Sequence, residues 1–486
     1  MASEEEIRLG RVNKIKILKE SGLESYPVES FRTHENSNFL KSFRELLSSG
    51  KPITLAGRIM SLRDQGGIVF ADLYDGTART QAILKKEDLS EEALELFIKT
   101  VDVSDFIEVT GTAFTTRRGV DSLLGRSWRM LAKSLRPVPD EWFGLKDEDE
   151  IYRRRYIDMI LNPEVTDLIR RRSIFWNSVR SFMLERDFTE VETPVLETMT
   201  GGADARPFIT HHNALDIDVF LRISVGELWQ KKMMVGGIPK TFEIGRIFRN
   251  EGMSYEHAND YTSFEFYEAY ADARRGIPML VDLYREVAEK TFGKLKFKIN
   301  NFDVDLGADW GSYNFCELLQ KEYGFDPRNV SLDQVMTLLN KHDISHEKNV
   351  ELGRGVDLLW KKIRKTIGGP AILTGMPVYL EPLAKKTPGD PRVVERFQIL
   401  IAGSEVGKAF NELNDPLDQR ERFESQQKLR ELGDLEAQMA DFEYVEAMEY
   451  GMPPVFGFGV SERLFSFLAG KSIRESQIFP LMRPRE

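Results

Sequence analysis

The residues best suited to chemistry lie in one stretch, KTFEIGRIFRNEGMSYEHANDYTSFEFYEAYAD, which spans residues 240–272. Two alternating runs flank a polar loop of about nine residues, a pattern that predicts a β-hairpin. The period of two puts Arg249 and Glu251 on one face of the first strand, and Glu265 and Tyr267 on one face of the second. A guanidinium held on a strand binds phosphate or carboxylate well, although an isolated arginine is more often a surface ion-pair residue.

A second alternating segment, KAFNEL at residues 408–413, places Lys408, Phe410 and Glu412 on one strand face. Glu412 is either a binding carboxylate or a solvated strand residue.

The single cysteine, Cys316, forms neither an internal disulfide nor a thiolate metal site, which agrees with a reducing compartment. A packed side chain is a more common role for such a cysteine than catalysis.

The N-terminal part of the sequence predicts a helical arm followed by a small β-barrel. Within residues 1–51, apolar residues recur at close to helical spacing, namely Leu9, Val12, Ile15 and Leu18. Residues 52–137 contain short alternating segments separated by glycine-containing turns. About five strands in this length fit an OB-fold, a frequent binder of unpaired oligonucleotides.

Residues 138–150, which carry Pro139 and the acidic LKDEDE, predict a linker to a larger domain at residues 151–486. That domain opens with Asn162-Pro163, a cap and a first-turn proline, and a long apolar stripe at helical spacing. DFTEVETPVL is strand-like, and strands return near residues 396–414. Helical patterns over about 313–365, with a capping-box pair at Ser331 and Gln334, predict a helical insertion between them.

Composition narrows the class of protein. A chain of 486 residues with 41% hydrophobic content is long enough for two or three domains. It has no run of about twenty apolar residues and a charged start, MASEEEIRLG, so we expect a cytoplasmic protein with no membrane association. A net charge of −11 argues against nonspecific coating of nucleic acid, but a selective RNA enzyme needs only a local positive strip. One candidate strip, which is equally a solvated face, comprises Arg117, Arg118, Arg126, Arg129, Lys133 and Arg136.

Three segments resemble the sequence motifs of the class II aminoacyl-tRNA synthetases. FRNEG with the loop and strand that follow it resembles motif 2, EVETPVL at residues 190–196 resembles motif 1, and GFGVSERLFSFL at residues 457–468 resembles motif 3. Residues 201–223 and 410–423 are similar to the lysyl branch of the subclass that carries an N-terminal OB domain. The resemblance, which covers nearly the whole chain, implies an α+β fold with an antiparallel sheet flanked by helices. It also implies a homodimer with the motif 1 helix at its two-fold interface.

The resemblance implies an ATP site that uses Mg²⁺. Its expected catalytic residues are Arg249, which holds the α-phosphate and the amino-acid carboxylate, and Arg463, which covers the adenine and reaches the γ-phosphate. The other expected ATP contacts are Glu251 at the adenine amino group, Tyr261 on an adenine face, His257 at the polyphosphate and Glu405 at Mg²⁺. Positioning and charge neutralisation carry such a reaction without a covalent enzyme intermediate.

The resemblance further implies that the substrate is L-lysine, which is activated with ATP and transferred to its tRNA. Glu412 beside Tyr267 is expected to hold the ε-ammonium, and Glu227 the α-amino group. Such a pocket leaves polar groups unmet when a neutral side chain enters. The expected lysine contacts are Glu227, Arg249, Glu265, Tyr267, Lys408, Phe410 and Glu412.

The resemblance also implies anticodon recognition by the barrel. Arg63, Phe70 and Gln81 match positions that read anticodon uracils, although Phe70 in isolation is more often a core residue.

Several positions depart from the usual lysyl pattern. Gln398 stands where a second metal-holding glutamate is expected, Lys408 where an asparagine is common, and Glu256 where a loop arginine touches phosphate. The segment RISVGEL is one residue longer than the common form, and residues 453–463 are one residue shorter. These changes put the number of Mg²⁺ ions in question more than the reaction.

Three alternatives remain open at this stage. One is an aspartyl or asparaginyl enzyme of the same subclass, which the carboxylates Glu412 and Glu227 oppose. Another is a synthetase-like tRNA-binding or regulatory protein without activation chemistry. The last is a truncated paralogue that modifies a translation factor, which would lack the N-terminal barrel.

Overall fold

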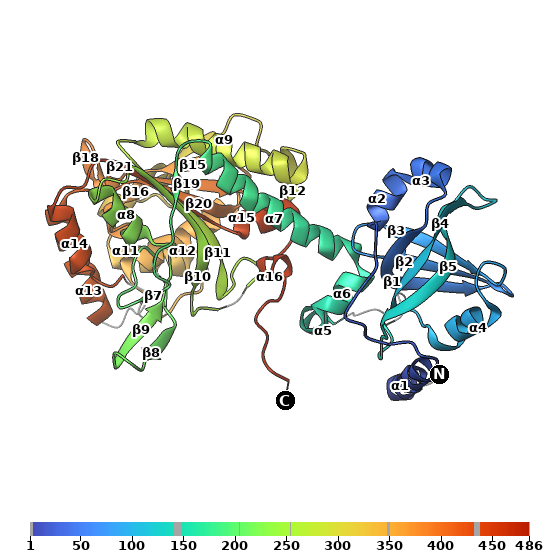
Figure 1. Ribbon diagram of the computed structural model, residues 1–486. Helices are drawn as coiled ribbons and strands as arrows, with labels where there is room; N and C mark the ends of the chain where they lie inside the picture. Colours follow the sequence, from blue (N-terminus) through green and yellow to red (C-terminus); the bar gives the residue numbers. More distant parts are fainter. Residues whose placement is uncertain are drawn as a thin grey trace. The chain divides into compact units, whose positions relative to one another are not determined.

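The computed structural model describes residues 3–139, 147–203, 205–252, 254–347, 350–431 and 438–485. The chain forms two compact units, Met1–Lys146 and Asp147–Glu486 (Figure 1). Most of the linker predicted at residues 138–150 lies outside the described residues. Among the helices that the structure describes, none has the length and apolar character needed to cross a bilayer.

The first unit is a closed five-stranded barrel with helices packed around it. The strands are β1 (Ile53–Asp64), β2 (Ile68–Tyr74), β3 (Arg79–Lys85), β4 (Phe106–Thr115) and β5 (Asp121–Ala132), in the order β1-β2-β3-β5-β4. The β3–β5 pair is parallel and the other pairs are antiparallel. This is the predicted OB-fold.

The N-terminal helices belong to the barrel core. The helices of this unit are α1 (Glu4–Glu20), α2 (Asn36–Lys41), α3 (Phe43–Ser49) and α4 (Glu91–Thr100). Leu18 of α1, Phe39 of α2 and Phe43 of α3 are buried in one cluster with the barrel strands. The predicted helical arm is therefore part of the folding unit that contains the barrel.

The second unit contains an eight-stranded sheet. In spatial order its strands are β14 (Gly311–Asn314), β15 (Ala371–Thr374), β19 (Arg396–Ile401), β20 (Ser404–Asn411), β21 (Val455–Ser461), β11 (Asp260–Ala269), β10 (Lys240–Phe248) and β6 (Thr189–Glu190). The two edge pairs, β14–β15 and β10–β6, are parallel, and the five central pairs are antiparallel. The predicted antiparallel sheet is thus confirmed.

Alternation along the central strands separates an apolar face from a polar face. Phe264 and Phe266 of β11 pack into a large core with α7 (Pro163–Leu184), α9 (Ala273–Phe292) and α15 (Arg463–Ala469). Figure 1 shows α7 and α9 side by side across this face. Glu265 and Tyr267, which alternate with the two phenylalanines, therefore face the other side of the sheet.

Two smaller helical groups complete the second unit. One contains α8 (Glu227–Val235), α13 (Pro416–Glu431) and α14 (Phe442–Glu449), which share a core with Tyr267 and Val455. The other is the predicted insertion, with α10 (Phe315–Tyr323), α11 (Leu332–Lys341) and α12 (Leu352–Arg364). The capping box between Ser331 and Gln334 is present. The remaining elements are α5 (Glu148–Arg153), α6 (Arg155–Leu161), β7 (Leu196–Glu197), β8 (Ile209–His212), β9 (Ile217–Leu221), β12 (Lys296–Ile299), β13 (Phe302–Asp305), η1 (Pro327–Asn329), β16 (Met376–Pro377), η2 (Val378–Leu380), β17 (Lys386–Thr387), β18 (Asp390–Val394) and α16 (Ile473–Ser476).

Three local predictions need correction. Asn162 precedes α7 but makes no side-chain cap, and its amide nitrogen donates instead to Asp158 Oδ1 at 2.6 Å. Only Thr189 and Glu190 of DFTEVETPVL pair with the large sheet. The prediction that Lys133 belongs to an exposed basic strip is wrong. Its side chain is fully buried, and its Nζ lies 2.6 Å from Asp105 Oδ2. A buried ammonium needs such a partner and offers nothing to RNA.

Candidate active site

A cavity of about 570 Å³ lies on the polar face of the sheet in the second unit. Its walls come from β10, β11, β19, β20 and β21, from the insertion helix α12 and from the loops around them. The predicted site residues that line it are Glu227, Arg249, His257, Tyr261, Glu265, Tyr267, Gln398, Glu405, Lys408, Phe410, Glu412 and Arg463. Residues up to 236 positions apart in the sequence thus meet in one pocket.

Arg249 lies at the end of the hairpin, not on the strand as predicted, because β10 ends at Phe248. Its backbone N–H donates to Asn259 O at 2.7 Å, and the Asn259 amide donates to both Arg249 O and Glu251 O. These bonds join the start of the loop to the residue that precedes β11. The guanidinium donates two 3.3 Å hydrogen bonds to Ile223 O and lies 5.9 Å from the Tyr261 ring centre. Glu251 is not among the residues that line the cavity.

Arg463, the first residue of α15, brings a second guanidinium to the same end of the cavity. It donates to Glu256 O at 3.3 Å and to Glu405 O at 3.2 Å. The Glu256 carboxylate lies 3.9 Å from Arg463 and accepts from Ser404 Oγ at 3.0 Å. An arginine carries five N–H donors, so two guanidinium groups held by backbone carbonyls form an anion-binding end.

The opposite end of the cavity holds buried carboxylates. Tyr267 donates its hydroxyl to Glu265 Oε2 at 3.0 Å, and Val225 N donates to Glu265 Oε1 at 2.8 Å. Glu412, only 2% exposed, has an Oε1 with no hydrogen-bond partner among the described residues. Gly457 allows this packing, since a Cβ there would lie 2.1 Å from Glu412 Oε1 and 2.5 Å from the Tyr267 ring.

Burial changes the acidity of these carboxylates. It raises the pKa of Glu265 to about 7, with the neighbouring Glu227 adding to the effect. Burial likewise raises the pKa of Glu412 to about 8, against the lowering influence of Lys231. A buried carboxyl with a raised pKa gains from a cationic ligand, because the ligand favours the charged form.

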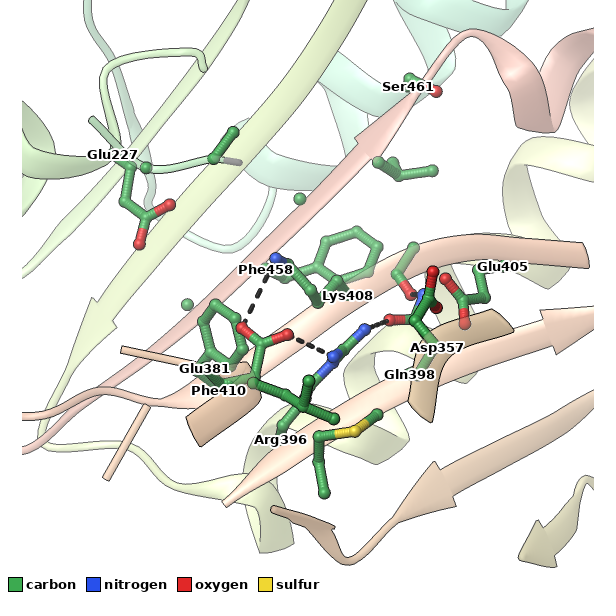
Figure 2. Close-up of a pocket in the computed structure, with 18 of the residues that line it drawn as sticks. Glu227, Asp357, Glu381, Arg396, Gln398, Glu405, Lys408, Phe410, Phe458 and Ser461 are labelled. Carbon is green, nitrogen blue, oxygen red and sulfur yellow. Dashed lines mark hydrogen bonds and ion pairs between the residues drawn. The ribbon is translucent and has the colours of Figure 1, made fainter. Parts of the chain in front are cut away.

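Lys408 belongs to a polar network on the cavity floor that Figure 2 shows. Its Nζ lies 3.7 Å from Glu381 Oε2, and Glu381 pairs with Arg396, which donates to Gln398 Oε1. The Gln398 amide nitrogen donates to Gly407 O at 2.8 Å. Glu381 and Arg396 were not singled out from the sequence, because neither lies in a motif and their pairing is tertiary.

The residues expected at Mg²⁺ differ in what they can offer a metal. Glu405 Oε1 accepts from Trp360 Nε1 at 2.7 Å, and its Oε2 lies 3.6 Å from Arg364. Burial raises the pKa of Glu405, but Arg396, Arg364 and Trp360 together bring it below its usual value, so the carboxylate stays ionised. In the described ranges no three His, Cys, Asp or Glu side chains gather as a metal site. A single carboxylate fits Mg²⁺ that is held mainly by substrate phosphates, whereas both ends of the Gln398 amide are already engaged.

The barrel unit carries the three other predicted residues on adjacent strands. Arg63 of β1 is paired in register with Phe70 of β2, and its guanidinium lies 5.8 Å from the Phe70 ring centre. Phe70 is half-buried and is not part of the barrel core, unlike its strand neighbours Val69 and Ala71. Gln81 accepts from Ser122 Oγ at 3.2 Å.

The family comparisons agree with this combination of barrel and sheet. The family described as tRNA synthetases class II (D, K and N) matches residues 147–483, and the OB-fold nucleic acid binding domain family matches residues 53–138. The chain therefore belongs to the class II tRNA synthetases. Within that class, several relatives at 38–40% identity are lysine–tRNA ligases.

Three of these relatives match over almost their whole length. The lysine–tRNA ligase of Thermosipho africanus is 39% identical over 485 residues, 99% of this chain and 96% of the relative. That of Fervidobacterium nodosum is 40% identical over 99% of this chain and 94% of its own. That of Bacillus subtilis is 38% identical over 98% of this chain and 97% of its own length. The resemblance inferred from the motifs is confirmed, and the chain is a member of the lysine–tRNA ligase family.

Proposed function

We propose that the protein is a lysine–tRNA ligase, which activates L-lysine with ATP to lysyl-adenylate and transfers the lysyl group to the 3′ end of the tRNA for lysine. The observation that carries the proposal is the polarity of the cavity. Among the lining residues, Arg249 and Arg463 lie near Tyr261 and His257, whereas the buried carboxylates of Glu227, Glu265 and Glu412 gather around Tyr267 and Lys231. The identity to lysine–tRNA ligases over nearly the whole chain supports the same reaction.

The arginine end suits the ATP phosphates. An oxygen of the lysine carboxylate attacks the α-phosphorus, a new P–O bond forms, and the bond to pyrophosphate breaks. Arg249 bridges the α-phosphate and the lysine carboxylate, while Arg463 neutralises the polyphosphate. Tyr261 stacks on the adenine, Glu251 accepts from its amino group and His257 contacts the polyphosphate. A ribose hydroxyl of the tRNA then attacks the mixed anhydride and releases AMP.

The carboxylate end suits an amino acid with two ammonium groups. Glu412 and Tyr267 receive the ε-ammonium, Glu227 and Glu265 lie toward the α-amino group, and Phe410 packs against the aliphatic chain. Lys408, whose ammonium lies 5.0 Å from the Phe410 ring centre, donates to the lysine carboxylate. An aspartate or asparagine side chain would meet carboxylates in this pocket.

Mg²⁺ is the remaining part of the ATP site in this proposal. When bound, the ion neutralises phosphate charge and orients the polyphosphate. Glu405 would supply a carboxylate ligand, and Gln398, whose amide is engaged by Arg396 and by Gly407 O, would supply at most a neutral oxygen.

ATP–pyrophosphate exchange with each of the twenty amino acids tests the proposed function. We expect lysine alone to support exchange. Exchange with aspartate or asparagine would assign the protein to another branch of the same class. Tight tRNA binding without exchange for any amino acid would favour a binding or regulatory protein instead.

Phe70 provides a test of anticodon recognition by the barrel. Because Phe70 is half-buried beside Arg63, Phe70→Ala should cost about 1–3 kcal/mol in tRNA affinity, the usual loss for one stacked base. Lysine activation without tRNA should not change. Affinity for an anticodon stem-loop and thermal unfolding should be measured together, with Leu73→Ala as a core substitution on the same strand. A lower melting temperature with unchanged affinity per folded molecule would make Phe70 a packing residue.

We also propose that the protein is a homodimer in the cytoplasm. Ile174 and Leu184 of α7 are 43% and 51% exposed, an apolar surface on the helix that the resemblance places at a two-fold interface. A monomeric mass in sedimentation equilibrium at micromolar concentration would contradict the dimer. A cytoplasmic location is supported by the single, buried Cys316.

A further inference from the structure

We infer that Lys231 is a positioning residue, which sets the charge of the amino-acid pocket and orients two of its carboxylates so that the pocket selects a substrate with two ammonium groups. Lys231 lies on α8 one turn after Glu227. It does not line the cavity. The inference rests on the proposed function and goes beyond it, because it assigns specificity to a side chain that touches no substrate.

Lys231 links two carboxylates that come from distant parts of the chain. Its side chain is 1% exposed, and its Nζ lies 2.7 Å from Glu227 Oε1 and 2.5 Å from Glu412 Oε2. The same ammonium lies 5.6 Å from the Tyr267 ring centre. The helix α8 and the segment after β20 are thus joined directly behind the wall to which Glu227 and Glu412 belong.

The charges around Lys231 explain why an ammonium is needed there. Glu227, Glu265 and Glu412 bring three carboxylates to the pocket, and Lys231 supplies one cation from behind. With lysine bound and all three carboxyls ionised, two negative charges remain, which is the number that the α-ammonium and the ε-ammonium of lysine neutralise. The lysine carboxylate is balanced separately by Arg249. Burial raises the pKa of Glu412 even with Lys231 in place, and loss of the ammonium would favour its protonation further, since Lys231 lowers that pKa. A neutral carboxyl holds an ammonium weakly.

The orientation of Glu412 gives a second reason. Its Oε2 forms an ion pair with Lys231 Nζ at 2.5 Å that lacks hydrogen-bond geometry, and its Oε1 is buried without a hydrogen-bond partner in the described part of the chain. A carboxylate fixed at one oxygen presents the other in a defined direction. Lys231 therefore fixes which oxygen of Glu412 is left for the substrate ammonium.

Lys231→Met tests this role, because methionine keeps much of the side-chain length and removes the charge. We expect the KM for lysine in ATP–pyrophosphate exchange to rise about tenfold or more, the effect of one charge-assisted hydrogen bond, and the KM for ATP to stay within twofold. Lys232→Met is the matched control, since Lys232 is the next residue of α8 but pairs with Asp441 at 3.5 Å outside the cavity. The control should leave both KM values unchanged.

The dependence on pH separates positioning from a general structural role. The charged and titratable groups that face Lys231 are Glu227 of α8, Glu412 after β20, Tyr267 of β11 and Tyr444 of α14, and Glu265 of β11 acts on Glu412. Without the ammonium these carboxyls protonate more easily, so the rise in lysine KM should be larger at pH 6.5 than at pH 8.5. Substrate lysine keeps its ε-ammonium over this range. A KM penalty that is equal at both pH values would overturn the inference.

Double substitution gives an independent check. If Lys231 acts through Glu412, adding Lys231→Met to Glu412→Gln should raise the lysine KM by less than it does in the parent. If Lys231→Met fails to fold, the lysine KM of Lys231→Gln is compared with that of the parent and of Glu412→Gln in the same way. If the parent protein shows lysine-dependent exchange and the variant has an unchanged KM for lysine, this inference alone is refuted. If the parent protein shows no lysine-dependent exchange, the proposed function is refuted as well.

Discussion

Arg249→Lys should lower the rate of lysyl-adenylate formation by at least about 100-fold, the loss typical of removing one preorganised donor from a transition state. Arg249 is held at the end of the hairpin by Ile223 O and lies against Tyr261, so its planar group has a fixed direction into the cavity. A compact ammonium cannot bridge phosphate and carboxylate from that position. Pre-steady-state formation of lysyl-adenylate with its pyrophosphate and ATP–pyrophosphate exchange measure the loss.

The control for this substitution is Arg246→Lys. Arg246 lies on β10, three residues before Arg249, pairs with Asp260 at the surface and does not line the cavity. We expect it to keep parental exchange, and we expect Arg249→Lys to keep tRNA affinity, because anticodon contacts belong to the barrel. Exchange by Arg249→Lys within a few-fold of the parent would rule out the assigned role.

Glu412→Gln should weaken lysine binding by about 1.5–3 kcal/mol, the contribution of a hydrogen bond between charged groups. Glu412 is 2% exposed, and its Oε1 lacks a partner among the described residues, so the substrate ammonium has no competing donor to displace there. Glutamine keeps the shape and removes the charge. Calorimetric titration with lysine should show the loss, while the KM for ATP stays near the parental value.

Glu449→Gln serves as the surface control for this experiment. Glu449 pairs with Arg420 and has a side chain that is 49% exposed, so its substitution should leave lysine affinity unchanged. Unchanged lysine affinity in Glu412→Gln would move the ε-ammonium to another partner. A fall in ATP affinity of the same size would indicate a general collapse of the cavity.

The sequence by itself determined the local pattern of this protein and, through its motifs, the family. Alternation in residues 240–272 and 408–413 predicted strands with charged residues on one face, and the structure places Glu265, Tyr267, Lys408 and Phe410 on the strands β11 and β20 that line the cavity. This succeeded because the two-residue period of a strand is a local property, which the order of polar and apolar residues expresses directly. The sequence defined the ends of the strands less well, since Arg249 lies just beyond the end of β10 and Glu412 just beyond the end of β20.

Only the tertiary structure decided which charges meet. Lys231 and Glu412 are 181 positions apart in the sequence, yet an ion pair joins them behind the pocket wall. Lys133 carried the same basic signal as its neighbours in the candidate strip but is buried against Asp105. A charged residue has the same local pattern whether water or a distant carboxylate solvates it, because the choice depends on long-range packing and desolvation. The specificity that we assign to Lys231 is therefore a property of the fold, which no segment of the sequence expresses alone.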